Sequence, residues 1–323
     1  MTEWPGDKAT GRVRKRWLHQ RQRLEGLAAL STPVGMRYWP KKSPLEIFLR
    51  SSRPLLRATG ILAAFTAHSL RVQRIDLCVT SPKLPKAFDG YRLLHLTDMH
   101  LDGNDHLAEA IAAAVAGTAP DLCVLTGDYG GEEHKHTNIV RQRLALILKA
   151  AAPHDGFVAV LGNHDEHTFA KHLHDLGVRP LINERLAVKR GDDAIWLTGL
   201  DDVSRFFTPA ARKAMAAPVD GFAIALVHSP EIADVAAASG HALYLCGHTH
   251  GGQVCLPGGA ALFKRLSLFR GYFRGVWRHH DLVGYTSQGA GFSVLPLRTF
   301  TTPEITVITL KCGEASVTAG ERR

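Results

Sequence analysis

Five apolar runs in this chain of 323 residues are followed by the same kinds of polar side chain, and this pattern constrains the fold more than any other. Each run has the length and composition of a buried strand. The runs lead into Asp98-Met99-His100, Asp128, Asn163-His164-Asp165, His228 and His248-Thr249-His250. A lone Asp or His in such a place usually caps a helix or lies in a turn. Five in succession indicate one site, because the carboxyl ends of strands in open α/β sheets gather around one crevice.

Alternating strands and helices after Arg74 predict an α/β fold. With 45% hydrophobic and 21% charged residues, the chain can bury a large core. The predicted strands cover residues 91–98, 121–128, 156–165, 194–202, 222–229 and 242–250, and the predicted helices cover 107–116, 139–151, 168–176 and 231–238. From Gly284 onward the chain is mostly β. Strands that alternate with helices in this way form sheets that are buried on both faces.

The polar residues at the strand ends are of the types that bind divalent metal ions. Carboxylates and imidazoles suit Mn, Fe and Zn, and two ions about 3.5–4 Å apart need a shared ligand such as a carboxylate. If Asp98-Met99-His100 is extended, its first and third side chains face the same side and both reach one ion. The same reasoning predicts that His248 and His250 emerge on one face, among glycines that let the backbone approach the metals.

These motifs, taken in order, resemble the calcineurin-like metallophosphoesterase family. They are D-x-H (Asp98, His100), G-D (Asp128), G-N-H-D (Asn163, His164), His228 and G-H-x-H (His248, His250). The segments CGHTHGGQVCLP and SQGAGFSVLPLRTFTTPEITVITL resemble a bacterial branch of membrane-associated phosphodiesterases that includes UDP-2,3-diacylglucosamine pyrophosphatases. This resemblance covers residues 75–311 and, with the strand-end ligands, implies a four-layer αββα sandwich. Two mixed sheets flanked by helices would carry a dimetal site at the strand ends.

The resemblance also implies a role for each residue. Asp98, His100 and His250 would hold one ion, Asn163, His228 and His248 the second, and Asp128 would bridge them. His164 would not be a ligand but would stabilise or protonate the leaving oxygen, with Asp165 as its orienting partner. The two divalent ions (Mn, Zn or Fe) would polarise the phosphoryl oxygens and lower the pKa of a bridging water, so that hydroxide attacks in line.

Several other polar residues have an ordinary structural explanation. Arg298 could contact phosphate, and a structural arginine is as good an explanation. His134 and His136 are expected in a solvated loop, and His95 is expected to face a neighbour in the sheet. The pair Asp201-Asp202 is expected in a turn or at a helix cap.

The basic charge is confined to the N-terminal segment, residues 1–74, which we separate from a catalytic domain at 75–323. The segment has fifteen Lys plus Arg against four Asp plus Glu, whereas the rest has 24 against 26. Such a block is usually a solvated tail. Residues 53–72 have an apolar core of only ten residues, which is too short to span a bilayer and fits a helix lying on an anionic membrane. We therefore expect residues 1–74 to bind membranes and to be dispensable for the metal centre.

The substrate is the least constrained part of the prediction. Residues 261–280 mix aromatic and basic side chains and could form a rim for a lipid-linked phosphate, such as UDP-2,3-diacylglucosamine in lipid A biosynthesis. The alternatives are a nuclease or nucleotide phosphodiesterase of the same fold, and a non-catalytic membrane or nucleic-acid binding module with a vestigial site. The lead interpretation expects no nucleic acid and no obligate protein partner. Five cysteines without C-x-x-C spacing predict reduced thiols and no structural zinc site, in a cytoplasmic protein peripheral at the inner membrane.

Overall fold

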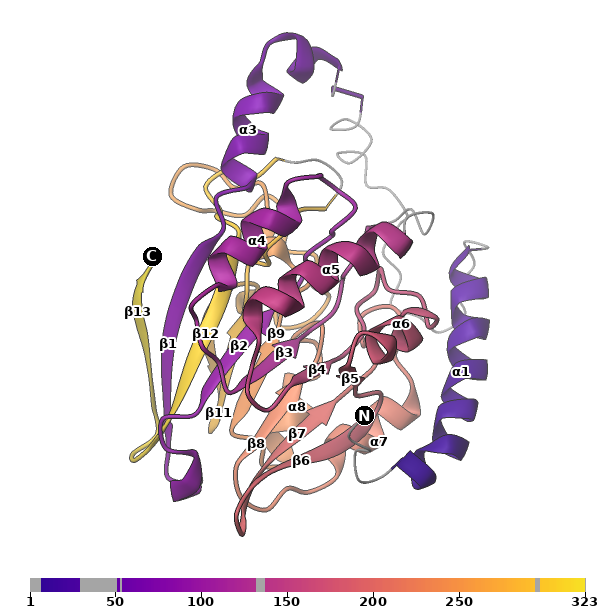
Figure 1. Ribbon diagram of the computed structural model, residues 1–323, viewed down its shortest axis with the longest axis vertical. Coiled ribbons are helices and arrows are strands. Elements are labelled where there is room, and N and C mark those ends of the chain that lie inside the picture. Colours follow the sequence, from indigo (N-terminus) through magenta and orange to yellow (C-terminus); the bar gives the residue numbers. More distant parts are fainter. Residues whose placement is uncertain (1–6, 30–50, 53, 132–136, 294–296, 323) are drawn as a thin grey trace.

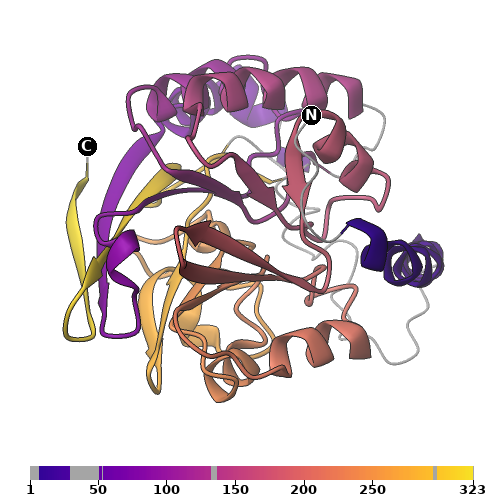
Figure 2. The ribbon, with the colours of Figure 1, turned by 60° about the horizontal axis from the view of Figure 1, so that its bottom comes forward.

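The computed structural model describes residues 7–29, 51–52, 54–131, 137–293 and 297–322. Within these residues the chain forms two mixed β-sheets packed face to face, with helices on both outer faces (Figures 1 and 2). This is the predicted four-layer αββα sandwich. His134 and His136 lie outside the described residues.

One sheet has the strand order β13–β1–β12–β2–β3–β4–β5. Its strands are β1 (Gln73–Ser81), β2 (Arg92–Leu96), β3 (Leu122–Leu125), β4 (Phe157–Ala159), β5 (Val178–Pro180), β12 (Glu304–Cys312) and β13 (Ser316–Arg322). Strands β2 to β5 run parallel to one another, whereas β12 is antiparallel to β2 and parallel to β1. Strand β1, the first strand in the sequence, therefore pairs with β12 and β13, the last two strands in the sequence.

The second sheet has the order β10–β11–β9–β8–β7–β6. Its strands are β6 (Glu184–Arg190), β7 (Asp193–Gly199), β8 (Ala223–Leu226), β9 (Leu243–Cys246), β10 (Gly275–His279) and β11 (Leu282–Thr286). Strands β7, β8, β9 and β11 are parallel, and β6 and β10 form antiparallel edges. The parallel strands of both sheets thus end at the same side of the sandwich. The polar residues that follow these strands lie at that side.

The helices lie on the outer faces of the sheets. They are α4 (Leu107–Val115), α5 (Thr137–Ala151) and α6 (Phe169–Asp175) on the first sheet, and α7 (Pro209–Ala216) and α8 (Ala233–Ala238) on the second. Strand β3 shows why the central strands are apolar throughout. Leu122 and Val124 fill the layer between the sheets, while Cys123 and Leu125 pack under the helices.

The sequence did not predict β1, β6 or α7. Strand β6 is a partly exposed edge with charged residues, so it lacks the alternating apolar pattern of a half-buried strand. Helix α7 is short and starts at Thr208, whose side chain accepts a hydrogen bond from the Ala211 amide at 3.2 Å, with Pro209 in the first turn. The predicted strand at 156–165 ends at Ala159, because the residues after it form the loop of the site.

Two helices of the N-terminal segment are described, α1 (Asp7–Ala29) and α3 (Ile61–Ser69). Helix α1 lies against the sandwich beside α6, and α3 projects from one end (Figure 1). Trp17 and Arg21 of α1 are buried. The interpretation of the first basic block as a solvated tail is therefore wrong for α1.

Candidate metal centre

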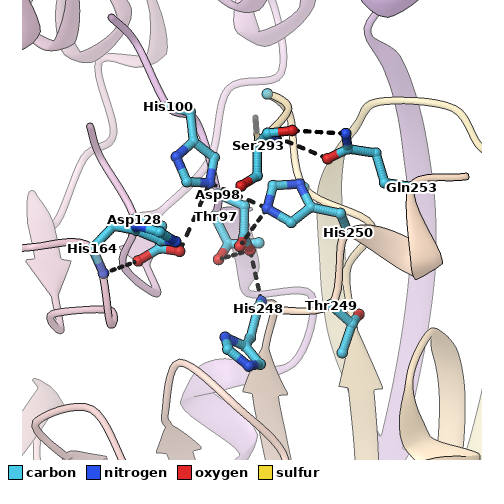
Figure 3. Close-up of polar contacts among 12 residues, drawn as sticks. Thr97, Asp98, His100, Asp128, His164, His248, Thr249, His250, Gln253 and Ser293 are labelled. Atoms are coloured by element: carbon cyan, nitrogen blue, oxygen red, sulfur yellow. Dashed lines mark hydrogen bonds and ion pairs between the residues drawn. The ribbon is translucent and has the colours of Figure 1, made fainter. Parts of the chain in front are cut away.

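The loops after β2, β3, β4, β8 and β9 bring seven predicted ligands together at the strand ends. In the first group, the Nε2 atoms of His100 and His250 lie 3.1 Å apart, and the Asp98 Oδ1 atom lies 3.4 Å from His250 Nε2. Figure 3 shows the two rings facing each other with the Asp98 carboxylate beside them. The three donor atoms lie close enough to hold one ion.

The second group contains Asn163, His228 and His248. The Asn163 Oδ1 atom lies 2.7 Å from His248 Nδ1 and 3.1 Å from His228 Nε2, and these two nitrogen atoms are 3.2 Å apart. The Asp128 Oδ2 atom lies 3.3 Å from His228 Nε2 and 3.7 Å from His100 Nε2. The Asp128 carboxylate is thus between the two groups, where a bridging ligand has to be.

Backbone carbonyls fix the tautomers of three of these histidines. His100 Nδ1 lies 3.0 Å from the Gly130 carbonyl, His228 Nδ1 lies 2.7 Å from that of Thr126, and His248 Nε2 lies 3.2 Å from that of Arg265. Each of these nitrogen atoms must be the protonated one to donate to a carbonyl. The other nitrogen of each ring then turns its lone pair toward the centre, which is the usual arrangement of a metal-binding histidine.

The residues fit a pair of divalent cations. His228 Nε2 and His248 Nδ1 face each other with lone pairs, an arrangement that a shared cation stabilises. Asp98 Oδ1 is buried and has no hydrogen-bond partner among the described residues, whereas buried carboxylate oxygens are normally bonded. The other oxygen, Asp98 Oδ2, accepts from the His248 amide at 2.9 Å and the Thr97 hydroxyl at 2.7 Å, which orients Oδ1 inward.

The charges of the site agree with this chemistry. Burial alone would raise the pKa of Asp128, but the imidazoles of His228, His164 and His100 hold that pKa well below its usual value. Burial alone would lower the pKa of His228, but Asp128 raises it well above its usual value, so a metal ion would bind at Nε2 in place of a proton. Asp128 is therefore anionic, as a bridging carboxylate must be.

The predicted extended geometry of the ligand pairs is wrong. Asp98, His100, Asp128, His248 and His250 all have positive φ angles, between 43° and 73°, which residues other than glycine rarely adopt. The Asp98 and His100 amides donate to the carbonyls of Gly127 and Asp128 at 3.0 and 3.1 Å. These bonds between loops fix left-handed turns. His248 and His250 consequently point to different metal groups rather than emerging on one face.

Two glycines leave room for the carboxylates. A Cβ atom on Gly247 would lie 2.0 Å from Asp98 Oδ2, and one on Gly162 would lie 2.2 Å from Asp128 Oδ1. Neither glycine has a positive φ, so the requirement is for space. This agrees with the expectation that glycine admits a close approach at the site.

The structure places His164 beside the centre but gives Asp165 other partners than the predicted one. The His164 ring lies edge-on to His100, with 5.3 Å between their centroids, and its amide donates to Asp128 Oδ1 at 2.9 Å (Figure 3). The ring thus borders the centre, where it could reach a leaving group. Asp165 does not orient that ring. Its carboxylate accepts from the amides of Gly162, Asp128 and Tyr129 at 2.7 to 2.9 Å, which ties two ligand loops together.

Arg298 is fully buried behind the centre. Its guanidinium donates to the carbonyls of Gln288 at 2.7 Å and Gly291 at 3.0 Å, and to that of His250 at 3.3 Å. With its donors directed at carbonyls, it is the structural arginine that the sequence left as the alternative to phosphate contact. Its contacts hold the turn that carries His250.

Of the other polar residues, His95 and Asp202 have the structural roles that the sequence predicts, facing a neighbour in the sheet and lying in a turn. His95 Nε2 lies 2.8 Å from the hydroxyl of Thr126, which directly follows the neighbouring strand β3, and the Asp202 carboxylate accepts from backbone amides of the turn that follows it. Asp201 instead pairs with Arg21 of α1, a contact over 180 residues that no local pattern indicates.

Residues 91–252 match the sequence profile of the calcineurin-like phosphoesterase family, which is half of the chain, and the chain belongs to that family. An uncharacterized metallophosphoesterase of Bacillus subtilis, YkuE, is 28% identical over 74% of this chain and 86% of its own length. A transmembrane protein with metallophosphoesterase domain from Danio rerio is 29% identical over 73% of this chain, but only 57% of that protein's length is covered. The phosphodiesterase YaeI of Escherichia coli is 27% identical over 68% of this chain and 82% of its own length.

Family and site together define a metallophosphoesterase, a hydrolase whose family uses two divalent metal ions. Within the described residues the cysteines are free thiols, as predicted. No helix in the described ranges is both long enough and apolar enough to cross a membrane.

Proposed function

We propose that this metallophosphoesterase hydrolyses a phosphodiester or pyrophosphate bond in a membrane-associated substrate such as UDP-2,3-diacylglucosamine, and that it binds the membrane peripherally. The observation that carries the proposal is an exposed apolar rim on loops that are joined to the turn carrying His250. It consists of Leu256, Leu262 and Phe300, whose exposed fractions are 51%, 47% and 61%.

Leu256 and Leu262 of the apolar rim lie on the segment that follows His250, and Phe300 lies on a loop that pairs with this segment. Residues 253–262 follow His250 directly, and isolated β-bridges join Val254 to Thr299 and Cys255 to Ala261. Exposed leucine and phenylalanine side chains clustered beside a polar site are typical of surfaces that contact lipid or another apolar partner. If the acyl chains of a lipid-linked substrate lay on the rim, the phosphate group of that substrate would lie near the ligands.

Basic residues and helix α3 lie close to the loops of the apolar rim. Lys264 and Arg274 flank the ring of Phe273 at 4.6 and 5.0 Å, and His68 of α3 lies 3.1 Å from the Thr301 carbonyl. Helix α3 and the loops at residues 253–262 and 297–301 lie at one end of the molecule (Figure 1). Each basic residue near an anionic leaflet contributes about 1 kcal/mol to membrane binding. Residues 75–323 carry 24 basic and 26 acidic side chains, which favours a lipid substrate over nucleic acid.

The chain's own residues would divide the chemistry among them. When bound, the two ions supply Lewis acidity and activate water. Asp98, His100 and His250 would hold one ion, Asn163, His228 and His248 the other, with Asp128 shared. His164 is held beside the centre by the hydrogen bond that its backbone amide donates to Asp128, and it would donate a proton to the leaving oxygen. The relative YaeI carries the name phosphodiesterase, which agrees with a diester substrate.

The test compares three substrates with Mn²⁺-loaded protein: bis(p-nitrophenyl) phosphate, UDP-2,3-diacylglucosamine in anionic vesicles, and single-stranded DNA. We expect hydrolysis of the first two. The variant Leu256→Ser/Leu262→Ser should keep the soluble activity and lose turnover on the lipid substrate. Leu146→Ser, an exposed leucine on α5, is the matched control. Preferred hydrolysis of DNA, or a rim variant with normal lipid turnover, would contradict the proposal.

A further inference from the structure

One face of α1 contacts the catalytic domain through three side chains that are four residues apart. Trp17 Nε1 donates to Asp201 Oδ2 at 2.6 Å. Arg21 is buried, and Glu25 accepts from the His167 amide at 2.8 Å and lies 2.6 Å from His167 Nδ1. Residues four apart lie above one another on a helix, so this is one continuous contact face. Arg23, between them in sequence, is exposed.

Arg21 directs its guanidinium at the loop that carries two residues of the site. Nη2 donates to the Asp165 carbonyl at 2.7 Å and to the Gly162 carbonyl at 3.4 Å, and Nη1 pairs with Asp201 at the end of β7. Its Cζ atom stacks 3.5 Å from the centroid of the Phe206 ring. Both carbonyls belong to residues 162–167, a segment that we call the Asn163 loop.

The Asn163 loop continues from these carbonyls to the metal ligands. The Asp165 carboxylate accepts from the Asp128 amide at 2.8 Å, and the His164 amide donates to Asp128 Oδ1 at 2.9 Å. Asn163 Oδ1 lies within 3.1 Å of both histidines of the second group. Arg21 is therefore two hydrogen bonds away from the bridging carboxylate, although α1 contributes no ligand.

We propose that Arg21 is a positioning residue for the Asn163 loop, and that α1 is in this way a working part of the metal centre. The expectation that residues 1–74 are dispensable for the centre is thereby replaced. The effect on turnover rests on the proposed hydrolytic function, whereas the effects on the loop and on metal binding do not.

A guanidinium has the geometry for this role and an ammonium does not. Arginine presents a fixed planar fork of donors, so it can bond the Asp201 carboxylate and the loop carbonyls at once. Lysine in the same place could neutralise Asp201, but a single ammonium on a flexible stem could not hold all three partners. A merely structural role, compensation of a buried carboxylate, would be preserved by lysine. The substitution Arg21→Lys therefore separates the two roles.

The experiment compares Arg21→Lys with Arg23→Lys, the same substitution at the exposed arginine of the same helix. Hydrogen–deuterium exchange is followed at residues 162–167, where the amides of Gly162, His164 and Asp165 are hydrogen bonded. Mn²⁺ binding is measured by titration, and kcat and KM with bis(p-nitrophenyl) phosphate. For Arg21→Lys we expect roughly tenfold or faster loop exchange, and metal affinity and kcat lowered about 10- to 100-fold with KM little changed. Arg23→Lys should match the wild type.

A second variant covers the case in which Arg21→Lys does not fold. Arg21→Met/Asp201→Asn removes both charges, so no buried carboxylate is left unpaired, and it should show the same release of the Asn163 loop. Wild-type loop exchange and metal binding in either folded variant would overturn the proposal. So would faster exchange spread evenly over the domain, because that indicates general destabilisation. If the wild type does not cleave the diester, the proposed function fails, while exchange and metal binding still decide the role of Arg21.

Discussion

Gly247→Ala should disable the first metal group by displacing one carboxylate. Gly247 lies between β9 and His248, and its added Cβ would lie 2.0 Å from Asp98 Oδ2 and 2.4 Å from Thr97 Oγ1. Observed Cβ contacts are essentially never closer than 3.0 Å, so the Asp98 carboxylate has to move by about 1 Å. Metal–ligand distances tolerate only about 0.2 Å, and a misplacement of about 1 Å costs roughly a hundredfold in rate.

The displaced carboxylate cannot relax easily. Asp98 Oδ2 is held by the His248 amide and the Thr97 hydroxyl, and Thr97 itself meets the new methyl group. We therefore expect Gly247→Ala to bind one ion far more weakly and to lose about a hundredfold in kcat.

Metal content by mass spectrometry and hydrolysis of bis(p-nitrophenyl) phosphate check this expectation for Gly247→Ala. Gly271→Ala is the matched control, because a Cβ at Gly271 meets nothing within 4 Å. Two tightly bound ions and normal turnover in Gly247→Ala would show that the steric reasoning is wrong.

Three further variants test other parts of the structure. Asp128→Asn should weaken both ions by about 10- to 100-fold, since a neutral amide bridges poorly; metal titration would contradict this if only one ion were affected. His164→Ala should lower kcat about 10²- to 10⁴-fold with both ions retained, and loss of the ions would refute its assignment as a proton donor. Burial lowers the pKa of His95 to about 3, so the neutral ring stabilises the fold above pH 6.5 and this stability is lost as the pH falls from 6.5 toward 3. The free energy of unfolding, measured with urea, should fall between pH 7 and pH 5 by about 2 kcal/mol less in His95→Gln than in the wild type. Equal losses in the two proteins would contradict this expectation.

The sequence predicted which residues gather at the strand ends but not the way in which the backbone presents them. Apolar strands that end in Asp, Asn or His are visible in the sequence, and parallel strands bring their ends together. The left-handed turns at Asp98 and His100 depend on hydrogen bonds to the loop after β3, some thirty residues away. Local propensity favours extended backbone there, and the tertiary contact overrides it.

Contacts between distant residues also explain why the sequence misassigned Asp165 and Asp201 and did not indicate the contacts of Arg21. Asp165 follows His164 in sequence, which suggested a partnership, but the loop turns its carboxylate toward three amides instead. The contact of Arg21 with Asp201 joins positions 180 residues apart. A basic run such as the one around Arg21 has no feature that marks one arginine for burial.

Helix α1 also has a consequence for the order in which the protein assembles. Its residues are synthesised before its partners on the Asn163 loop and at Asp201, which follow 141 to 180 residues later. At translation rates of about 5–20 residues per second, the docking site of α1 is complete roughly 7–36 s after α1 itself. The ligand loops after β2, β3 and β4 are therefore made before α1 can brace them, and those after β8 and β9 only later. Docking of α1 therefore cannot precede the synthesis of Asp201, although α1 precedes every ligand loop in the sequence.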